Sequence, residues 1–449
     1  MVRKLPTETL KLPVPFGKAF DRSVKYVNPI LHIMPSMGLR RRTSKLPGFA
    51  DRLWLLKISL ALVLLVEFLL SPKLWIASRS YPLTPIFEWL PSVPPLIDRL
   101  WLVLLLFLLL AIVVARRPRA YIIAFVVLAG LLSLFDQSRW QPWFYQFVFM
   151  LAALVLYPWG EQDPQKREAT LNICRLIVAC TYFWSGFQKL NTSFVEDVFP
   201  WLVAPLVALL PGSLEELTRP LGIAIPFVEA SIGLGLLTRF RNAAVILALG
   251  MHVFILLCIG PFGHDWNTIV WPWNVAMIAF VVILFWRVEG FSTKRVLVPL
   301  ASPFHGLALF LFGIMPLFSF FGLWDSYLSA SLYSGNTKGA TIYISEDMKS
   351  RLPETIRDLA LKSGADGTNI VSIADWSFKE LNVSPYRESR VFKNVARHVC
   401  AYTEQPAEVK LVISGKPNPI DGSEEAEVYD CSGLETGEHE ALKPRDPTR

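Results

Sequence analysis

One lysine in an otherwise apolar segment is the side chain with the clearest potential for chemistry. Lys189 lies near the end of the segment TYFWSGFQKLN, residues 181–191, where aromatic and small residues surround its amine. Removal from water disfavours the ammonium form, so a lysine in such surroundings can lose its proton and act as a base. The structural alternative is a lysine at the membrane interface that binds the carbonyl groups at the end of its own helix.

Two histidines form the second group of candidate reactive side chains. His252 lies in the middle of a predicted helix, where it either forms a hydrogen bond to a neighbouring helix or lines a polar cavity. His264 lies in the turn IGPFGHDWN, residues 259–267, next to Asp265. It is either half of a titrating pair with that carboxylate or a solvated residue of the turn. No metal-ligand set of His and Cys, phosphate-binding loop or serine-nucleophile motif occurs in the sequence.

Other charged residues fall within apolar segments, where a charge is costly unless it is paired or hydrated. They are Lys57, Glu67, Arg175 and Glu229. For Lys57 and Glu67 the structural interpretation is an internal ion pair or a side chain that reaches the membrane interface. A continuous polar path along Glu67, Arg175 and Glu229 would instead indicate a transporter.

The overall composition predicts the elements that position these residues. Hydrophobic residues make up 53% of the chain and its mean hydropathy is +0.41, which is too apolar for a water-soluble protein of 449 residues. Because about 20 apolar residues in a helix cross a bilayer, we expect an α-helical, multi-pass membrane protein with about eight or nine transmembrane helices. The candidate segments are residues 53–70, 100–115, 121–134, 144–158, 171–187, 221–237, 243–259, 268–286 and 303–321.

One apolar segment is too short to cross the membrane. Residues 199–210 lie among Pro200, Pro205, Pro211 and Pro220, which favours a re-entrant or interfacial segment.

Basic residues in the short loops predict the orientation, because cytoplasmic loops collect Lys and Arg. The basic N-terminal segment, residues 1–50, is expected in the cytoplasm, and the C-terminal domain then lies on the periplasmic or lumenal side. The net charge of +7 is attributed to orientation and to contact with membrane lipid. Nucleic-acid binding is not expected, since no fold signature accompanies the charge. The basic residues of the inner loops are Arg116, Arg117, Arg119, Lys166, Arg167, Arg239, Arg241, Arg287, Lys294 and Arg295.

The composition changes sharply near Ser329, from apolar runs to mixed charge, which predicts a second domain. The predicted organisation is a basic segment (1–50), a transmembrane domain (51–325), an extracytoplasmic α+β domain (326–434) and a disordered tail (435–449). Within the α+β domain we expect strands at 340–344 and 409–413 and helices at 348–363 and 386–402.

The cysteines do not form a metal-binding or disulfide framework as a group. Cys174, Cys180 and Cys258 lie in apolar segments and are interpreted as packing residues. Cys400 and Cys431 belong to the domain placed outside, where the compartment is oxidising. The sequence leaves open whether these two cysteines form a disulfide.

Three motifs in chain order resemble a known membrane-protein family. The segment YFWSGFQKL, residues 182–190, is similar to the Tyr-Phe-x-x-Gly-x-x-Lys-Leu signature of the vitamin K-dependent gamma-carboxylase and HTTM (horizontally transferred transmembrane) proteins. His252 followed by Ile259-Gly-Pro-Phe262 is similar to their second signature, a helix with a histidine that ends in an Ile-Gly-x-Phe turn. Residues 325–333 lead into a strand as the family's membrane part leads into its outer region. The resemblance covers roughly residues 50–410.

This resemblance implies a reaction and a set of site residues. It implies that Lys189 is the base in the oxygenation of a reduced quinone similar to vitamin K hydroquinone, with His252 and His264 as further catalytic residues and a protein or peptide substrate on the outer side. The residues then expected to contact the quinone are Tyr182, Trp184, Gly186 and Phe262. No metal is implied.

The sequence also departs from the family pattern. Gln188 replaces a lysine common in the signature, the spacing from His252 to Ile259 is short, and the long C-terminal extension of the animal enzymes has no counterpart. The similar DoxX-like proteins share the scaffold without an assured reaction. The alternative is therefore a non-catalytic membrane component that holds a partner of an envelope redox or assembly system.

Overall fold

The computed structural model describes residues 51–91, 93–209, 216, 218–298, 302–362 and 368–445, with only the backbone for 442–445. The basic N-terminal segment that we predicted to be cytoplasmic lies outside the described residues.

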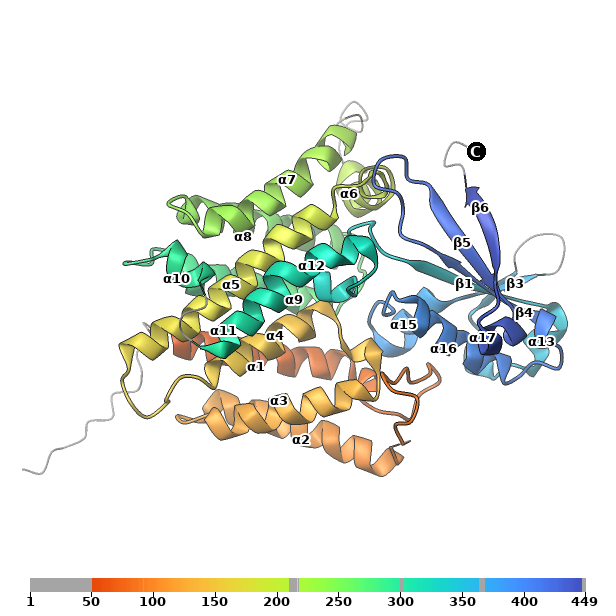
Figure 1. Ribbon diagram of the computed structural model, residues 1–449, viewed down its shortest axis with the longest axis horizontal. Coiled ribbons are helices and arrows are strands. Elements are labelled where there is room, and N and C mark those ends of the chain that lie inside the picture. The colour runs from red at the N-terminus through yellow and green to blue at the C-terminus, as the bar shows by residue number, and fades with distance from the viewer. Residues whose placement is uncertain are drawn as a thin grey trace, which may run out of the picture. The chain divides into compact units, whose positions relative to one another are not determined.

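Most of the described chain between residues 51 and 321 is helical, and every apolar stretch predicted to form a helix does so (Figure 1). Five helices are long and apolar enough to cross a membrane: Arg52–Leu70, Pro95–Val114, Thr218–Leu236, Arg241–Ile259 and Pro303–Phe321. Three apolar helices are shorter than a full span: Arg119–Leu134, Pro142–Leu154 and Val270–Phe285. The described part of the chain therefore has fewer clear spanning helices than the eight or nine predicted. The principal helices are α1 (Arg52–Leu70), α2 (Pro95–Val114), α3 (Arg119–Leu134), α4 (Pro142–Leu154), α5 (Pro164–Gln188), α7 (Thr218–Leu236), α8 (Arg241–Ile259) and α9 (Val270–Phe285).

The remaining helical segments are less regular. The last span is built from α11 (Pro303–Ala308), the π-helical η5 (Leu309–Ile314), α12 (Met315–Phe318) and one 3-10 turn, η6 (Ser319–Phe321). The short segment predicted to be re-entrant or interfacial forms the nine-residue helix α6 (Phe199–Val207), preceded by the π-helical η3 (Phe194–Val198).

Local sequence explains where two central helices begin. The Asp51 carboxylate accepts hydrogen bonds from the first backbone N–H groups of α1, and Asp163 does the same for α5, whose first residue is Pro164. Such acceptors satisfy amide groups that have no partner within the helix, and proline at the first position loses no helical bond.

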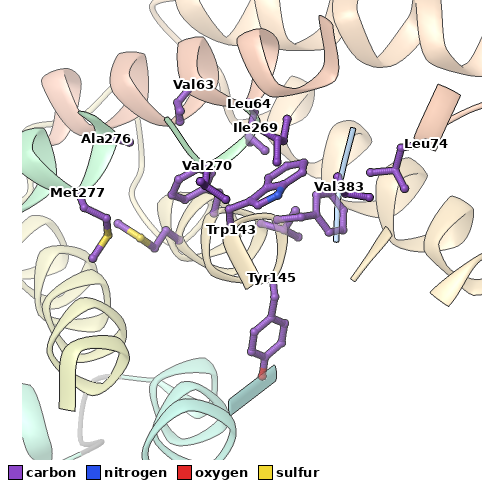
Figure 2. Packing of buried hydrophobic residues seen from close by; sticks show 14 of the residues in the cluster. Val63, Leu64, Leu74, Trp143, Tyr145, Ile269, Val270, Ala276, Met277 and Val383 are labelled. Carbon is purple, nitrogen blue, oxygen red and sulfur yellow. The ribbon is translucent and has the colours of Figure 1, made fainter. Parts of the chain in front are cut away.

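Large side chains from α1, α4 and α9 fill the centre of the helical part. Figure 2 shows Trp143 of α4 among Leu64 of α1 and Ile269 and Val270 at the start of α9. Trp143, Leu64, Ile269 and Val270 are almost fully buried. Val383 from the C-terminal domain lies in the same group, so the apolar core continues into that domain.

The C-terminal domain is built on one antiparallel sheet, in the order β2-β3-β1-β4-β5-β6. Central strands pair Ile342 with Leu411 and with Val371, so these buried side chains share one face. Helices α15 (Ile373–Leu381) and α16 (Ser389–Cys400) pack against the central strands. The strands are β1 (Gly339–Ile344), β2 (Ala360–Lys362), β3 (Asn369–Ser372), β4 (Val409–Ser414), β5 (Glu424–Tyr429) and β6 (Glu440–Arg445).

The structure corrects two details of the predicted domain. The single helix expected at 348–363 is instead α13 (Glu346–Arg351), α14 (Glu354–Arg357) and strand β2. Pro353 separates the two helices, because the residue before a proline is disfavoured in helical conformation. The tail expected to be disordered from residue 435 instead contains strand β6, which pairs with β5.

Cys400 and Cys431 form a disulfide between the end of α16 and the start of α17 (Cys431–Thr436).

Polar contacts hold the sheet domain against loops at one end of the helical part. The Glu380 carboxylate accepts hydrogen bonds from the backbone N–H groups of Ser80 and Tyr81. The Arg390 guanidinium pairs with Asp325, at 2.9 Å between Nη1 and Oδ1. Helical part and sheet domain belong to one compact unit, and residues from both surround the pockets described below.

Candidate functional site

A mostly apolar cavity of about 110 Å³ lies among helices α5, α7, α8 and α9. Aromatic and aliphatic side chains form most of its wall, and polar groups are confined to a few positions. Its apolar lining includes Phe199, Leu202, Ile225, Met251, Ile255 and Trp273, and its polar lining includes Tyr182, Ser185, Lys189, Glu229, His252 and Asn274. The predicted candidates Lys189, His252 and Tyr182 therefore face one cavity.

Lys189 makes the helix-capping contact that was one of its two predicted roles. It is the residue that ends α5, and its Nζ donates to the Ser185 carbonyl oxygen at 3.1 Å, as a helix-capping lysine does. The same Nζ lies 2.8 Å from Oε2 of Glu229 and 2.7 Å from the Ser185 hydroxyl. The Lys189 side chain is 11% exposed and that of Glu229 is 9% exposed. The amine is thus a largely buried, paired group at the cavity wall.

Two glycines allow the close approach of α5 and α7 that brings Lys189 beside Glu229. A Cβ atom on Gly186 would lie 2.3 Å from the backbone nitrogen of Ala230, and one on Gly233 would lie 2.6 Å from the Ala179 carbonyl oxygen. Neither position has room for a larger residue. Gly186, which we expected to contact a cofactor, instead packs against the backbone of α7.

A chain of hydrogen bonds runs across the cavity wall from α5 to α9. The Tyr182 hydroxyl lies 2.5 Å from His252 Nε2, and His252 Nδ1 lies 2.7 Å from the amide oxygen of Asn274. The Asn274 amide nitrogen donates to the Val270 carbonyl, so its oxygen is left to accept a hydrogen bond from His252 Nδ1–H. A neutral imidazole in this tautomer accepts a hydrogen bond from the Tyr182 hydroxyl at Nε2. The arrangement can therefore take up a proton at His252 Nε2.

Three predicted site residues lie elsewhere. His264 Nε2 donates to the Trp201 carbonyl at 2.6 Å and its ring stacks on Trp201, so its partner is not Asp265. Phe262 is 86% exposed and does not line the cavity. The Trp184 indole donates to the Gly313 carbonyl and lines a smaller neighbouring pocket.

Some lining residues were not predicted from the sequence. Asn274 was missed, although a lone amide within the apolar helix VWPWNVAMIAF is the kind of signal that marks a polar contact between membrane helices. Ser185 and Trp273 carry no such signal, because serine and tryptophan are common in membrane helices for packing alone.

The other charged residues of the helical part have structural partners or lie apart from the cavity. Lys57 Nζ donates to the carbonyl groups of Val113 and Ala115 at the end of α2, both at 3.0 Å. Arg175 pairs with Glu168. The Glu67 carboxylate is fully buried and has no hydrogen-bond partner among the described residues. Neither Glu67 nor Arg175 lines the cavity that contains Glu229, which does not favour a transport path.

Among the described residues, no group of three or more His, Cys, Asp or Glu side chains is placed to hold a metal ion. The chain matches no protein-family model, no curated protein and no solved structure.

Proposed function

We propose that the chain is a multi-pass membrane enzyme that takes a proton from a lipid-soluble quinol in the cavity beside Lys189. The observation that carries this proposal is that Lys189 and His252 line one largely apolar cavity inside the helical part. A ligand that dissolves in the membrane suits such a wall, and a volume of about 110 Å³ is of the order that holds one small aromatic ring. The motif resemblance to the vitamin K-dependent gamma-carboxylase and HTTM proteins supports the same proposal.

The lining residues suit the ring of a reduced quinone. Phe199, Met251 and Ile255 would contact the faces and edges of the ring. The polar groups could bind its hydroxyl groups from two sides: Lys189 with Glu229 on one, and Tyr182 with His252 on the other. When bound, a reduced quinone supplies electrons for reaction with oxygen.

The protein's part in this chemistry is to move and hold protons. Glu229 pairs with the Lys189 ammonium, and transfer of a proton from Nζ to the Glu229 carboxylate would leave an amine able to accept one from a ligand hydroxyl. His252 would hold a second proton at Nε2, while Asn274 fixes the orientation of the imidazole. The apolar wall would exclude bulk water from the reacting groups.

The topology belongs to this proposal. We propose that the shorter apolar helices α3, α4 and α9, together with α5, also cross the membrane, which gives about eight or nine spans. The N-terminus would lie in the cytoplasm and the sheet domain on the periplasmic or lumenal side, where it could present a protein or peptide substrate. Lipid would contact the exposed apolar faces of helices such as α2, in which Leu100, Val103 and Phe107 are exposed.

The non-catalytic, DoxX-like alternative would be favoured by a lysine that faces lipid headgroups. The burial of Lys189 at the wall of an apolar cavity supports the enzyme instead.

The test is an oxygen-dependent turnover assay on purified protein with reduced naphthoquinones. We expect Lys189→Ala to lower turnover about 100-fold or more, the usual effect of losing a positioned proton acceptor. Lys294→Ala removes an exposed lysine that does not line the cavity. This variant is the matched control and should keep wild-type turnover. Absence of turnover with every quinol, in wild type of normal folded yield, would favour the non-catalytic alternative.

A further inference from the structure

A second, more polar pocket of about 480 Å³ lies where the sheet domain meets the outer ends of the helices. The helical side contributes Trp201 of α6 and Trp266, and the sheet domain contributes Phe378 of α15 and Arg387. Hydroxyl groups are frequent in its wall. Because aromatic and polar groups converge in a pocket of this size, it can bind a water-soluble molecule.

The polar pocket and the Lys189 cavity share two wall residues. Leu332 and Tyr333 line both. Tyr333 has a positive φ of 54°, a left-handed conformation that costs a residue other than glycine about 1 kcal/mol. Its hydroxyl accepts a hydrogen bond from the Asn267 amide at 2.6 Å and its ring stacks on Trp201. These contacts hold the side chain between the two spaces.

The charges of the polar pocket point to an anionic ligand. Arg387 lines it, and among the described residues no carboxylate lies within 4.0 Å of the Arg387 guanidinium. Its hydrogen bond to the Lys338 carbonyl is long at 3.4 Å, and its side chain also interacts with the uncharged Tyr327 hydroxyl. Two carboxylates also line the pocket: Asp197 accepts a hydrogen bond from Ser193, and Glu424 has interactions of its own. Arg387 is therefore the charged group best able to pair with a ligand, and a guanidinium prefers a carboxylate or phosphate.

We propose that the polar pocket binds a water-soluble reactant with an anionic group, carboxylate or phosphate, held by Arg387. Leu332 and Tyr333 separate this reactant from the lipid-soluble ligand beside Lys189. The inference rests on the proposed function, because it assigns the second reactant of the same site. It extends that function by giving the enzyme two entrances, one from the membrane and one from the water on the outer side.

Thiol labelling tests the charge preference without any need for turnover. In a chain whose Cys174, Cys180 and Cys258 are replaced, Thr337→Cys places a single free thiol in the polar pocket. We expect an anionic methanethiosulfonate to react faster than a cationic one, when each rate is divided by that reagent's rate with a free thiol. Arg387→Gln should lower the ratio of the anionic rate to the cationic rate about three- to tenfold. Lys410→Gln, which removes the same charge from an exposed position outside the pocket, should leave it unchanged.

A preference for the cationic reagent, or a ratio that Arg387→Gln does not change, would overturn the assignment of an anionic ligand. Carboxylate and phosphate are then distinguished by which of acetate and inorganic phosphate slows labelling of the Thr337→Cys thiol.

The same labelling tests whether Leu332 and Tyr333 separate the polar pocket from the Lys189 cavity. A thiol at position 185, introduced as Ser185→Cys, lies on the far side of Tyr333 and should react slowly with the water-soluble anionic reagent. Tyr333→Ala should raise this rate about tenfold or more, whereas Tyr333→Phe, which keeps the ring, should raise it much less. If Tyr333→Ala does not fold, Leu332→Ala provides the same test. Equal labelling rates at position 185 with and without the Tyr333 ring would contradict this separation. Loss of quinol turnover alone would remove the proposed function but leave these labelling results standing.

Discussion

The Lys189 amine, the Glu229 carboxylate and the Tyr182–His252 pair place two separate proton-binding groups on one apolar wall. Each would be costly to bury alone, and each is paired here. Because His252 donates to Asn274, its remaining nitrogen depends on the Tyr182 hydroxyl for a partner whenever the cavity is empty.

Tyr182→Phe should therefore leave His252 Nε2 without its donor. We expect the free energy of unfolding to fall by about 1–2 kcal/mol, the usual cost of a buried acceptor that loses its partner. Thermal unfolding in detergent measures the change. Tyr121→Phe removes a hydroxyl from an exposed position on α3 and should have little effect. Equal losses in the two variants would show that the Tyr182 hydroxyl is not a structural partner of His252.

At the scale of helices, the site depends on how closely α5 crosses α7. A side chain at Gly186 would meet the backbone of α7 at Ala230 and Pro226, and backbone atoms cannot move aside as a flexible side chain can. The crossing therefore fixes the distance between Lys189 and Glu229.

Gly186→Ala should lower the free energy of unfolding by about 1–3 kcal/mol and reduce turnover, because it forces α5 and α7 apart. Gly250→Ala is the matched control, since a Cβ at that position in α8 has no heavy atom within 4 Å. Alanine is the better helix former, so this control should be neutral or slightly stabilising. An unchanged free energy of unfolding in both Gly186→Ala and Gly250→Ala would contradict the close contact between α5 and α7.

A buried ion pair fixes the loop that joins α3 to α4. Asp136 lies 2.5 Å from Arg79, and both side chains are fully buried. Burial by itself raises the pKa of the Asp136 carboxyl, but Arg79 and Arg139 outweigh it, so this pKa lies below its usual value. A carboxyl whose pKa is lower in the folded state stabilises the fold above its unfolded-state pKa, and the contribution is lost as the pH falls through the folded-state value.

Asp136→Asn should accordingly be less stable than wild type by about 3 kcal/mol at pH 7, because two buried guanidinium groups lose their counter-charge. The difference should be constant down to about pH 4 and shrink below it. Thermal unfolding of both proteins over a pH series measures it. A difference that grows as the pH falls would contradict the depressed pKa of Asp136.

The sequence predicted those site residues that stand out from their local surroundings, and it missed contacts between distant segments. Lys189 and His252 were found because a charge or an imidazole in an apolar segment stands out. Gly186 was found by its motif, but its place against α7 depends on a long-range contact that no local pattern contains. The His264–Asp265 pair, one of the two alternatives for His264, does not form, because adjacency in sequence does not decide which partner a turn residue meets.

At the scale of the whole molecule, the sheet domain covers one end of the helical part. It supplies part of the wall of the polar pocket, and its Glu380 and Arg390 hold the adjoining loops and helix ends. Composition predicted this domain and two of its strands. It did not predict β2, β3, β5 or β6, because a strand depends on pairing with its neighbours more than on its own sequence.

The Cys400–Cys431 disulfide gives a test of orientation. If the domain lies in an oxidising compartment, protein from intact membranes treated at once with an alkylating reagent and denaturant should show both cysteines blocked until reduction. The free cysteines Cys174, Cys180 and Cys258 should be alkylated in the same denatured sample without reduction, as an internal control. Alkylation of Cys400 and Cys431 without reduction would place the domain on the reducing side.

The most direct measurement of the central claim is photolabelling with a naphthoquinone that carries a photoreactive group, followed by mapping of the labelled peptides. We predict labels on α5 and α8 around the cavity, competed by unlabelled naphthoquinone and lost in Ile255→Trp, which fills the cavity. Labels spread over the exposed face of α2, without competition and unchanged by Ile255→Trp, would contradict a quinol site beside Lys189.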